Sequence, residues 1–135
     1  MKPDFRWLLI LALASSFSWA APGHVQHDPF QQCMMRTETD RRTCTAGCGM
    51  IVGACYEEAI LALERDIEAV SIALQQSGND ECVSLGTLYV QRHSELMQSV
   101  ADKAEARPGW INAELRLNLT RQKLGNLGLI AKECS

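Results

Sequence analysis

Apolar residues recur every three or four positions from residue 48 to residue 76, and this spacing predicts one long helix. Its large apolar side chains share one face: Ile60, Leu63, Ile67, Val70 and Leu74. A second face carries mostly smaller residues: Cys48, Ile51, Cys55, Ala59, Ala62, Ala69 and Ala73. We therefore expect the helix to contact neighbours on two sides. Gly78 suits the left-handed position that ends such a helix.

The same periodicity predicts three further helices. A short polar helix over residues 30–43 carries Cys33. A helix over residues 84–106 ends at Pro108 and Gly109. Its inward face is expected to hold Leu85, Leu88, Tyr89, Leu96, Met97 and Val100. The last helix, over residues 110–134, has a heptad series of apolar and small residues: Trp110, Ala113, Leu117, Thr120, Leu124, Leu127, Ala131 and Cys134.

These helices predict an all-α fold, because no alternating stretch is long enough for a sheet. Short turns between the three long helices force them to run up, down and up. The expected architecture is an antiparallel three-helix bundle with a short extra N-terminal helix. This topology brings the end of the last helix beside the loop carrying Cys82, so we expect a Cys82–Cys134 disulfide. A bridge closing a loop of that length contributes roughly 4 kcal/mol.

Six cysteines in a small exported domain are typical of three disulfides. Cys48 and Cys55 lie seven residues apart in one helix, about 10.5 Å along its axis, which is too far for a disulfide. Two arrangements then remain for the first four cysteines. They are Cys33–Cys55 with Cys44–Cys48, our working assignment, or Cys33–Cys48 with Cys44–Cys55.

Residues 1–20 have the three parts of a secretory signal. Lys2 and Arg6 give a basic start, residues 7–14 are apolar, and Ser18 and Ala20 are the small residues that a signal peptidase requires. The apolar run is too short to span a bilayer. We therefore expect a periplasmic or secreted protein, with a flexible arm over residues 21–29 and a single helical domain over residues 30–135.

The charge of the exported part is mildly acidic. Without residues 1–20 the chain has 11 basic and 15 acidic side chains, a net charge of −4. Nucleic acids select for basic surfaces, so we expect no nucleic-acid partner. Glu57, Glu64 and Glu68 lie within about 40° of one another on the helix, with Glu58 beside them. We interpret this acidic strip as a binding face for a basic protein, with an ordinary solvated face as the alternative.

No motif of a catalytic site occurs in the chain, so we do not expect an enzyme. His93 is expected to be a half-buried packing residue. The main alternative function is copper binding, because thioether sulfur and imidazole nitrogen suit copper. Its ligands would be His24, His27, Met34 and Met35. We predict no metal or other cofactor, since disulfide formation removes the thiolates that a tight site would use.

Met50, Cys55 and the acidic helical segment that follows resemble the core of the LprI-type lysozyme-inhibitor family. Those proteins are small, exported and helical, and in them a Met precedes a Cys that opens a helix. The family's acid and apolar positions match here, whereas its Asn and Tyr are replaced. The four positions are Glu64, Ile67, Glu68 and Ser71. The resemblance implies an envelope protein that binds a peptidoglycan-cleaving enzyme.

We therefore expect an exported protein that acts by binding a basic cell-wall hydrolase. If the target is a lysozyme, the chain is a lysozyme inhibitor; if it is a secreted toxin, the chain is an immunity protein. A periplasmic copper-binding protein and a structural envelope component are the alternatives.

Overall fold

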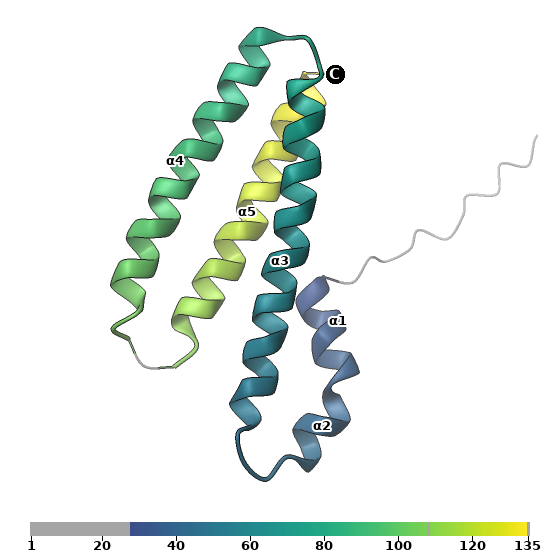
Figure 1. Cartoon of the computed structure of the whole chain (residues 1–135), viewed down its shortest axis with the longest axis vertical. Helices are drawn as coiled ribbons and strands as arrows, with labels where there is room; N and C mark the ends of the chain where they lie inside the picture. The colour runs from purple at the N-terminus through teal and green to yellow at the C-terminus, as the bar shows by residue number, and fades with distance from the viewer. Residues whose placement is uncertain (1–27, 108, 135) are drawn as a thin grey trace, which may run out of the picture.

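The fold is all-α, as the periodicity predicts. A computed structural model describes residues 28–107 and 109–134, and this part of the chain contains no strand. It forms five helices (Figure 1): α1 (Pro29–Arg36), α2 (Glu38–Thr43), α3 (Cys48–Gln75), α4 (Asp80–Ala104) and α5 (Ile111–Glu133). The expected signal over residues 1–20 and the first seven residues of the expected arm over residues 21–29 lie outside the described residues.

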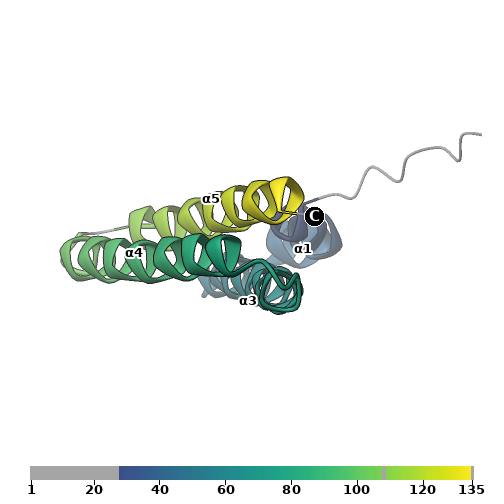
Figure 2. The ribbon, with the colours of Figure 1, turned by 90° about the horizontal axis from the view of Figure 1, so that it is seen from above.

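The three long helices run up, down and up, which confirms the predicted antiparallel bundle (Figure 1). Seen from above, α5 lies against both α3 and α4 (Figure 2). The ribbons of α3 and α4 are closest near the turn that joins them, and they diverge toward the other end of the molecule. As a result, α5 supplies most of the surface on which the other two helices pack.

The N-terminal helix begins and divides at positions that the hydrophobic pattern does not mark. Asp28 caps α1 through a bond from the Phe30 amide, and Pro29 occupies the first helical position, where it is favoured. The last two residues of the expected arm therefore belong to this helix and its cap. The expected single helix over residues 30–43 is divided at Thr37, whose hydroxyl donates to the Cys33 carbonyl.

The predicted seam of α3 forms the core. Ile60, Leu63, Ile67 and Leu74 are buried, and Val70 is partly buried. They contact α5, whose fully buried residues include Leu117 and Leu127. The heptad prediction for α5 is confirmed in its middle, while Trp110 at its start is 45% exposed.

The second face of α3 is covered over only part of its length. Cys55 and Ala59 are buried there, next to α1. Ala69 and Ala73 are exposed, because α1 and α2 accompany only the N-terminal half of α3. The expectation of neighbours along both sides of the whole helix is therefore wrong for its C-terminal half.

The predicted inward face of α4 is right for only half of its residues: Tyr89, Met97 and Val100 are partly buried, and Tyr89 packs against the core. Leu85, Leu88 and Leu96 are each about half exposed, and the buried residues are Gly86, His93 and Ala104. The helix packs mainly on α5 and touches α3 only lightly. A small residue at position 86 allows close approach to α3, so the side that carries it becomes the inner one.

Three disulfides fix the ends of the bundle. Cys33–Cys55 joins α1 to α3, Cys44–Cys48 closes the turn before α3, and Cys82–Cys134 joins the first turn of α4 to the end of α5. Of the two arrangements left open for the first four cysteines, the structure has the working assignment, Cys33–Cys55 with Cys44–Cys48. Disulfides indicate maturation in an oxidising, extracytoplasmic compartment. Among the described helices, none combines the length and apolar character that crossing a membrane requires.

Candidate protein-binding surface

The four acidic residues of the predicted strip all lie exposed on α3. They are Glu57, Glu58, Glu64 and Glu68. Two apolar side chains share this outward side of the helix: Leu61 is 57% exposed and Ile72 is 47% exposed. The surface therefore combines carboxylates with apolar groups that have no cover in the described part of the chain.

Two of the four carboxylates are engaged within the molecule. An Arg116 nitrogen lies 3.0 Å from the Glu57 carboxylate and joins α5 to α3. An Arg36 nitrogen lies 2.6 Å from the Glu58 carboxylate and joins α1 to α3. These pairs reduce the negative charge at the N-terminal end of the strip. Both are substantially exposed, so each contributes at most about 1 kcal/mol to stability.

Glu64 and Glu68 differ from the other two. Neither makes an ion pair or a hydrogen bond to another described side chain. They are four residues apart, so they lie one helical turn from each other on the same side of α3. The free negative charge of the strip is therefore concentrated at these two residues, with Leu61 before them and Ile72 after them.

An aromatic cluster holds the N-terminal half of α3 in place. Tyr56 is buried, with its ring centre 4.5 Å from that of Phe30 in α1 and 6.0 Å from that of Trp110 before α5. Burial raises the pKa of the Tyr56 hydroxyl, and the negative charge of Glu114 raises it further. The positive charge of Arg121 acts in the opposite direction. Together with the Cys33–Cys55 disulfide, the rings attach α1 firmly to the helix that carries the acidic residues.

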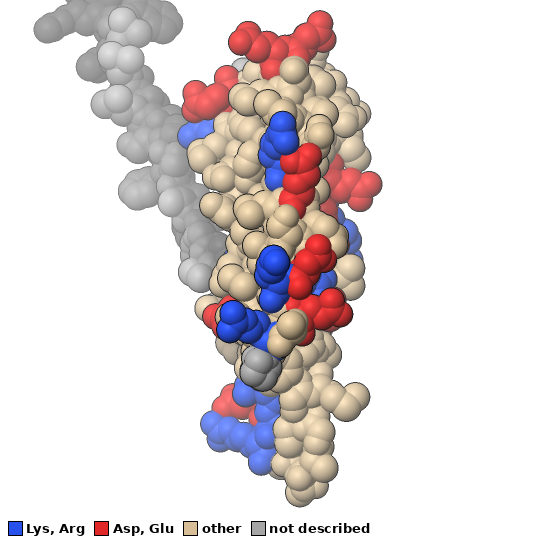
Figure 3. Space-filling model, turned by 90° about the vertical axis from the view of Figure 1, so that its left-hand side faces the viewer, with Lys and Arg blue, Asp and Glu red and all other residues tan. Residues whose placement is uncertain are grey.

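The outer side of α4 has a different character (Figure 3). Basic and acidic side chains lie next to one another there, separated by wide uncharged areas. Arg92 and Glu95 form one such pair at 2.9 Å. Because the charges on this side alternate in sign, it lacks the single-sign field expected to attract a basic protein.

His93 is more deeply buried than the sequence suggests. Its residue exposure is 6%, and neither ring nitrogen has a hydrogen-bond partner with good geometry among the described residues. Burial lowers the pKa of His93, and the nearby charge of Lys123 acts in the same direction. A weakly aligned hydrogen-bonding contact with the Leu119 backbone opposes this shift. Burial and the charge of Lys123 thus both favour the neutral imidazole.

The alternative copper ligands are only partly within the structure. Met34 is half-buried and Met35 is 54% exposed, and both border a shallow hollow that also contains Arg41. His24 and His27 lie outside the described residues. Within those residues, no group of three or more His, Cys, Asp or Glu side chains is arranged to hold a metal.

Sequence reasoning missed the cations that determine which acids are free. Arg36 lies on α1 and Arg116 on α5, and no spacing within α3 indicates where they contact it. Comparisons of the chain with protein-family models, with curated proteins and with solved structures found no match.

Proposed function

We propose that this chain is an exported protein that binds and inhibits a basic cell-wall hydrolase. The observation that carries the proposal is the pair of free carboxylates at Glu64 and Glu68, next to exposed Leu61 and Ile72. Charge of one sign speeds the encounter with an oppositely charged partner, and apolar side chains then contribute to the affinity of the contact.

The disulfides support the same function. A binding surface that is already rigid loses less conformational entropy when its partner arrives. Cys33–Cys55 and Cys82–Cys134 restrain the two ends of the bundle, and α3 runs between them. An oxidising periplasm, where cell-wall hydrolases act, would preserve both bridges.

The resemblance of the segment after Cys55 to the LprI-type lysozyme inhibitors favours a lysozyme as the target. A secreted toxin that cleaves peptidoglycan has the same requirements, in which case the chain is an immunity protein. Membership of the family and the choice of target are both parts of the proposal.

The test measures inhibition of several purified basic lysozymes by the disulfide-bonded protein. We expect a Glu64→Lys, Glu68→Lys variant to lose inhibition by at least tenfold, about 1.4 kcal/mol. The matched control is Glu105→Lys, Glu133→Lys, which has the same change in net charge near helix C-termini, where lysine is tolerated. Inhibition that is equal for the two variants, at unchanged helicity, would contradict the surface assignment. Absence of inhibition of every lysozyme would direct the search to peptidoglycan-cleaving toxins.

A further inference from the structure

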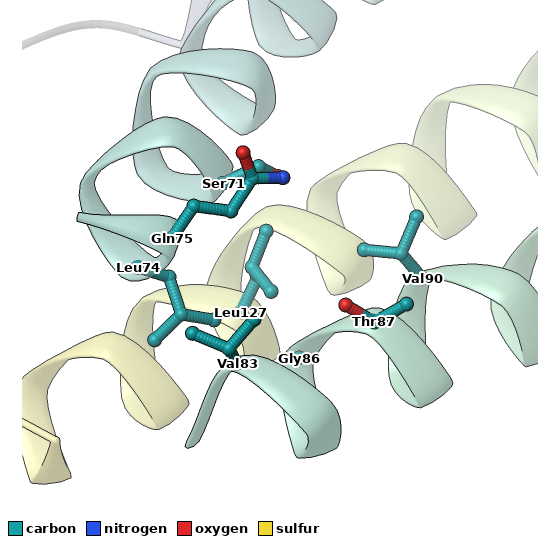
Figure 4. Close-up of a pocket in the computed structure, with 8 residues that line it drawn as sticks. All are labelled: Ser71, Leu74, Gln75, Val83, Gly86, Thr87, Val90 and Leu127. Atoms are coloured by element: carbon teal, nitrogen blue, oxygen red, sulfur yellow. The ribbon is translucent and has the colours of Figure 1, made fainter. Parts of the chain in front are cut away.

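A groove runs between α3 and α4, with α5 as its floor, and its upper part is apolar. This upper hollow has a volume of about 150 Å³. Figure 4 shows Leu74, Val83 and Leu127 directed toward one another at one end, with Thr87 and Val90 across from Ser71 and Gln75. The hollow exists beside Gly86, where a Cβ atom would lie 2.2 Å from a methyl carbon of Leu74.

A second hollow, of about 280 Å³, is lined by other residues of the same three helices. Its lining residues lie one helical turn further along each of the three helices. On α3, Ile67 precedes Ser71 by four residues; on α4, Ser94 follows Val90 by four. On α5, Lys123 precedes Leu127 by four. The two hollows therefore follow one another along the groove between α3 and α4, and the second is the more polar.

The polar part contains groups that lack partners. His93 lines it with both ring nitrogens buried, and apart from the weakly aligned contact with the Leu119 backbone neither nitrogen has a partner in the described protein. A buried polar group of this kind requires an explanation, because native proteins satisfy nearly all of them. Lys123 is half-buried and makes no ion pair within the described chain.

The charges around the polar hollow favour an anion. Lys123 and Arg116 extend from α5, and Arg116 already contacts Glu57. The single acidic residue in its lining is Glu64, an exposed residue of α3. The neutral imidazole of His93 has one N–H, which makes no hydrogen bond of good geometry within the described protein, and the Lys123 ammonium has three. A carboxylate that accepts from both would satisfy the buried donor and the unpaired cation together.

We propose that this groove binds a small amphiphilic monocarboxylate, with the carboxylate between Lys123 and His93 and the apolar group in the upper hollow. An apolar cavity of about 150 Å³ accommodates a benzene-sized group. The ligand class is therefore a medium-chain fatty acid or an arylalkanoic acid. This site requires neither the proposed inhibitory function nor the carboxylate of Glu68.

The test is calorimetric titration of the disulfide-bonded protein with octanoate, and with octan-1-ol and octylammonium as uncharged and cationic probes. We expect saturable binding of octanoate and weaker binding of the other two. Lys123→Gln should weaken octanoate binding about tenfold and leave octanol binding unchanged. Lys132→Gln, on the same helix but outside the groove, is the matched control and should bind as the wild type does.

A second variant tests the apolar half. Ser71→Leu places an apolar side chain at the upper hollow and should weaken both octanoate and octanol. Each variant is compared with the wild type by circular dichroism, so that loss of fold is recognised. Absence of saturable octanoate binding would overturn the proposal. Preference for octylammonium would also overturn it, as would octanoate binding that neither Lys123→Gln nor Ser71→Leu changes.

Discussion

Asp28 and Arg121 are 93 residues apart in the sequence and form a two-point ion pair. The Arg121 Nε and Nη2 atoms donate to the two carboxylate oxygens over 2.7 and 2.6 Å. One of those oxygens also accepts from the Phe30 amide, so the residue that caps α1 is the residue that ties it to α5. The contact is bidentate and charge-assisted, which is the stronger class of ion pair.

Substitutions at Asp28 should separate capping from charge. Asn is as good an N-cap as Asp but cannot pair ionically with Arg121, whereas Ala removes both functions. We expect Asp28→Ala to lower the free energy of unfolding by about 1–3 kcal/mol and Asp28→Asn by less. Urea denaturation of the oxidised protein measures both. Equal losses for the two variants would mean that the cap contributes nothing.

The same pair makes stability depend on pH. The hydrogen bond from Arg121 is the main cause that lowers the pKa of Asp28 below its usual 3.8; its charge and the backbone amides add to this, while burial opposes it. A carboxyl with a depressed folded pKa stabilises the fold above its unfolded pKa, and the contribution is lost as pH falls through the folded value. Stability of the wild type should therefore exceed that of Asp28→Asn near neutral pH, and the difference should shrink below about pH 4. A difference that stays constant down to the acid limit would contradict the ion pair.

Glycine substitutions should show opposite signs along the bundle. In a helix interior, replacing Gly by Ala raises the free energy of unfolding by about 1 kcal/mol, provided that the added methyl group has room. Gly125 and Gly128 have no heavy atom within 4 Å of an added Cβ, so Ala at either should stabilise the protein. At Gly86 the added Cβ would meet Leu74, and overpacking costs about 1–3 kcal/mol, so Ala should destabilise. Thermal melts of the three variants decide this, with Gly125→Ala as the matched control.

These glycines show which helix contacts the sequence can predict and which it cannot. Two glycines in the last helix suggest either a close helix contact or a kink, yet the open space beside Gly125 and Gly128 excludes the contact. The close approach occurs instead at Gly86, on a helix whose leucines suggest the other face. A helical period identifies apolar faces, but which one is buried depends on the neighbouring helix.

The tertiary features also fall into those that the sequence predicts and those that it does not. The seam of α3 and the up-down-up order follow from periodicity and loop length, and both are present. The cleft around His93 depends on how α3 and α4 diverge over α5, which local sequence does not encode. The pairing of Glu57 with Arg116 likewise joins residues 59 positions apart and leaves no mark within either helix.

The Cys82–Cys134 bridge should dominate the stability of the C-terminal hairpin. Its partners are 52 residues apart, and replacing both by Ser should cost roughly 4 kcal/mol, because the unfolded chain gains the entropy of an open loop. Urea denaturation measures this loss. Peptide mapping without reduction should recover Cys82 joined to Cys134 in the wild type; recovery of Cys134 with Cys33 or Cys44 would contradict the helix order.

The two halves of the acidic strip should behave differently toward a basic hydrolase. Glu64→Gln, Glu68→Gln removes the free charge, so association should slow and its dependence on salt should weaken, since screening acts over about 8 Å at physiological ionic strength. Glu57→Gln, Glu58→Gln removes carboxylates already paired with Arg116 and Arg36.

This second variant leaves two cations unpaired and should lower stability by at most about 1 kcal/mol per pair. Both variants remove two negative charges, so net charge alone predicts equal rates for them. Stopped-flow measurement of the association rate at several salt concentrations distinguishes steering by the free carboxylates from steering by net charge. If the Glu57→Gln, Glu58→Gln variant associates as slowly as the Glu64→Gln, Glu68→Gln variant, with the same salt slope, then overall charge and not the position of the free carboxylates directs the encounter.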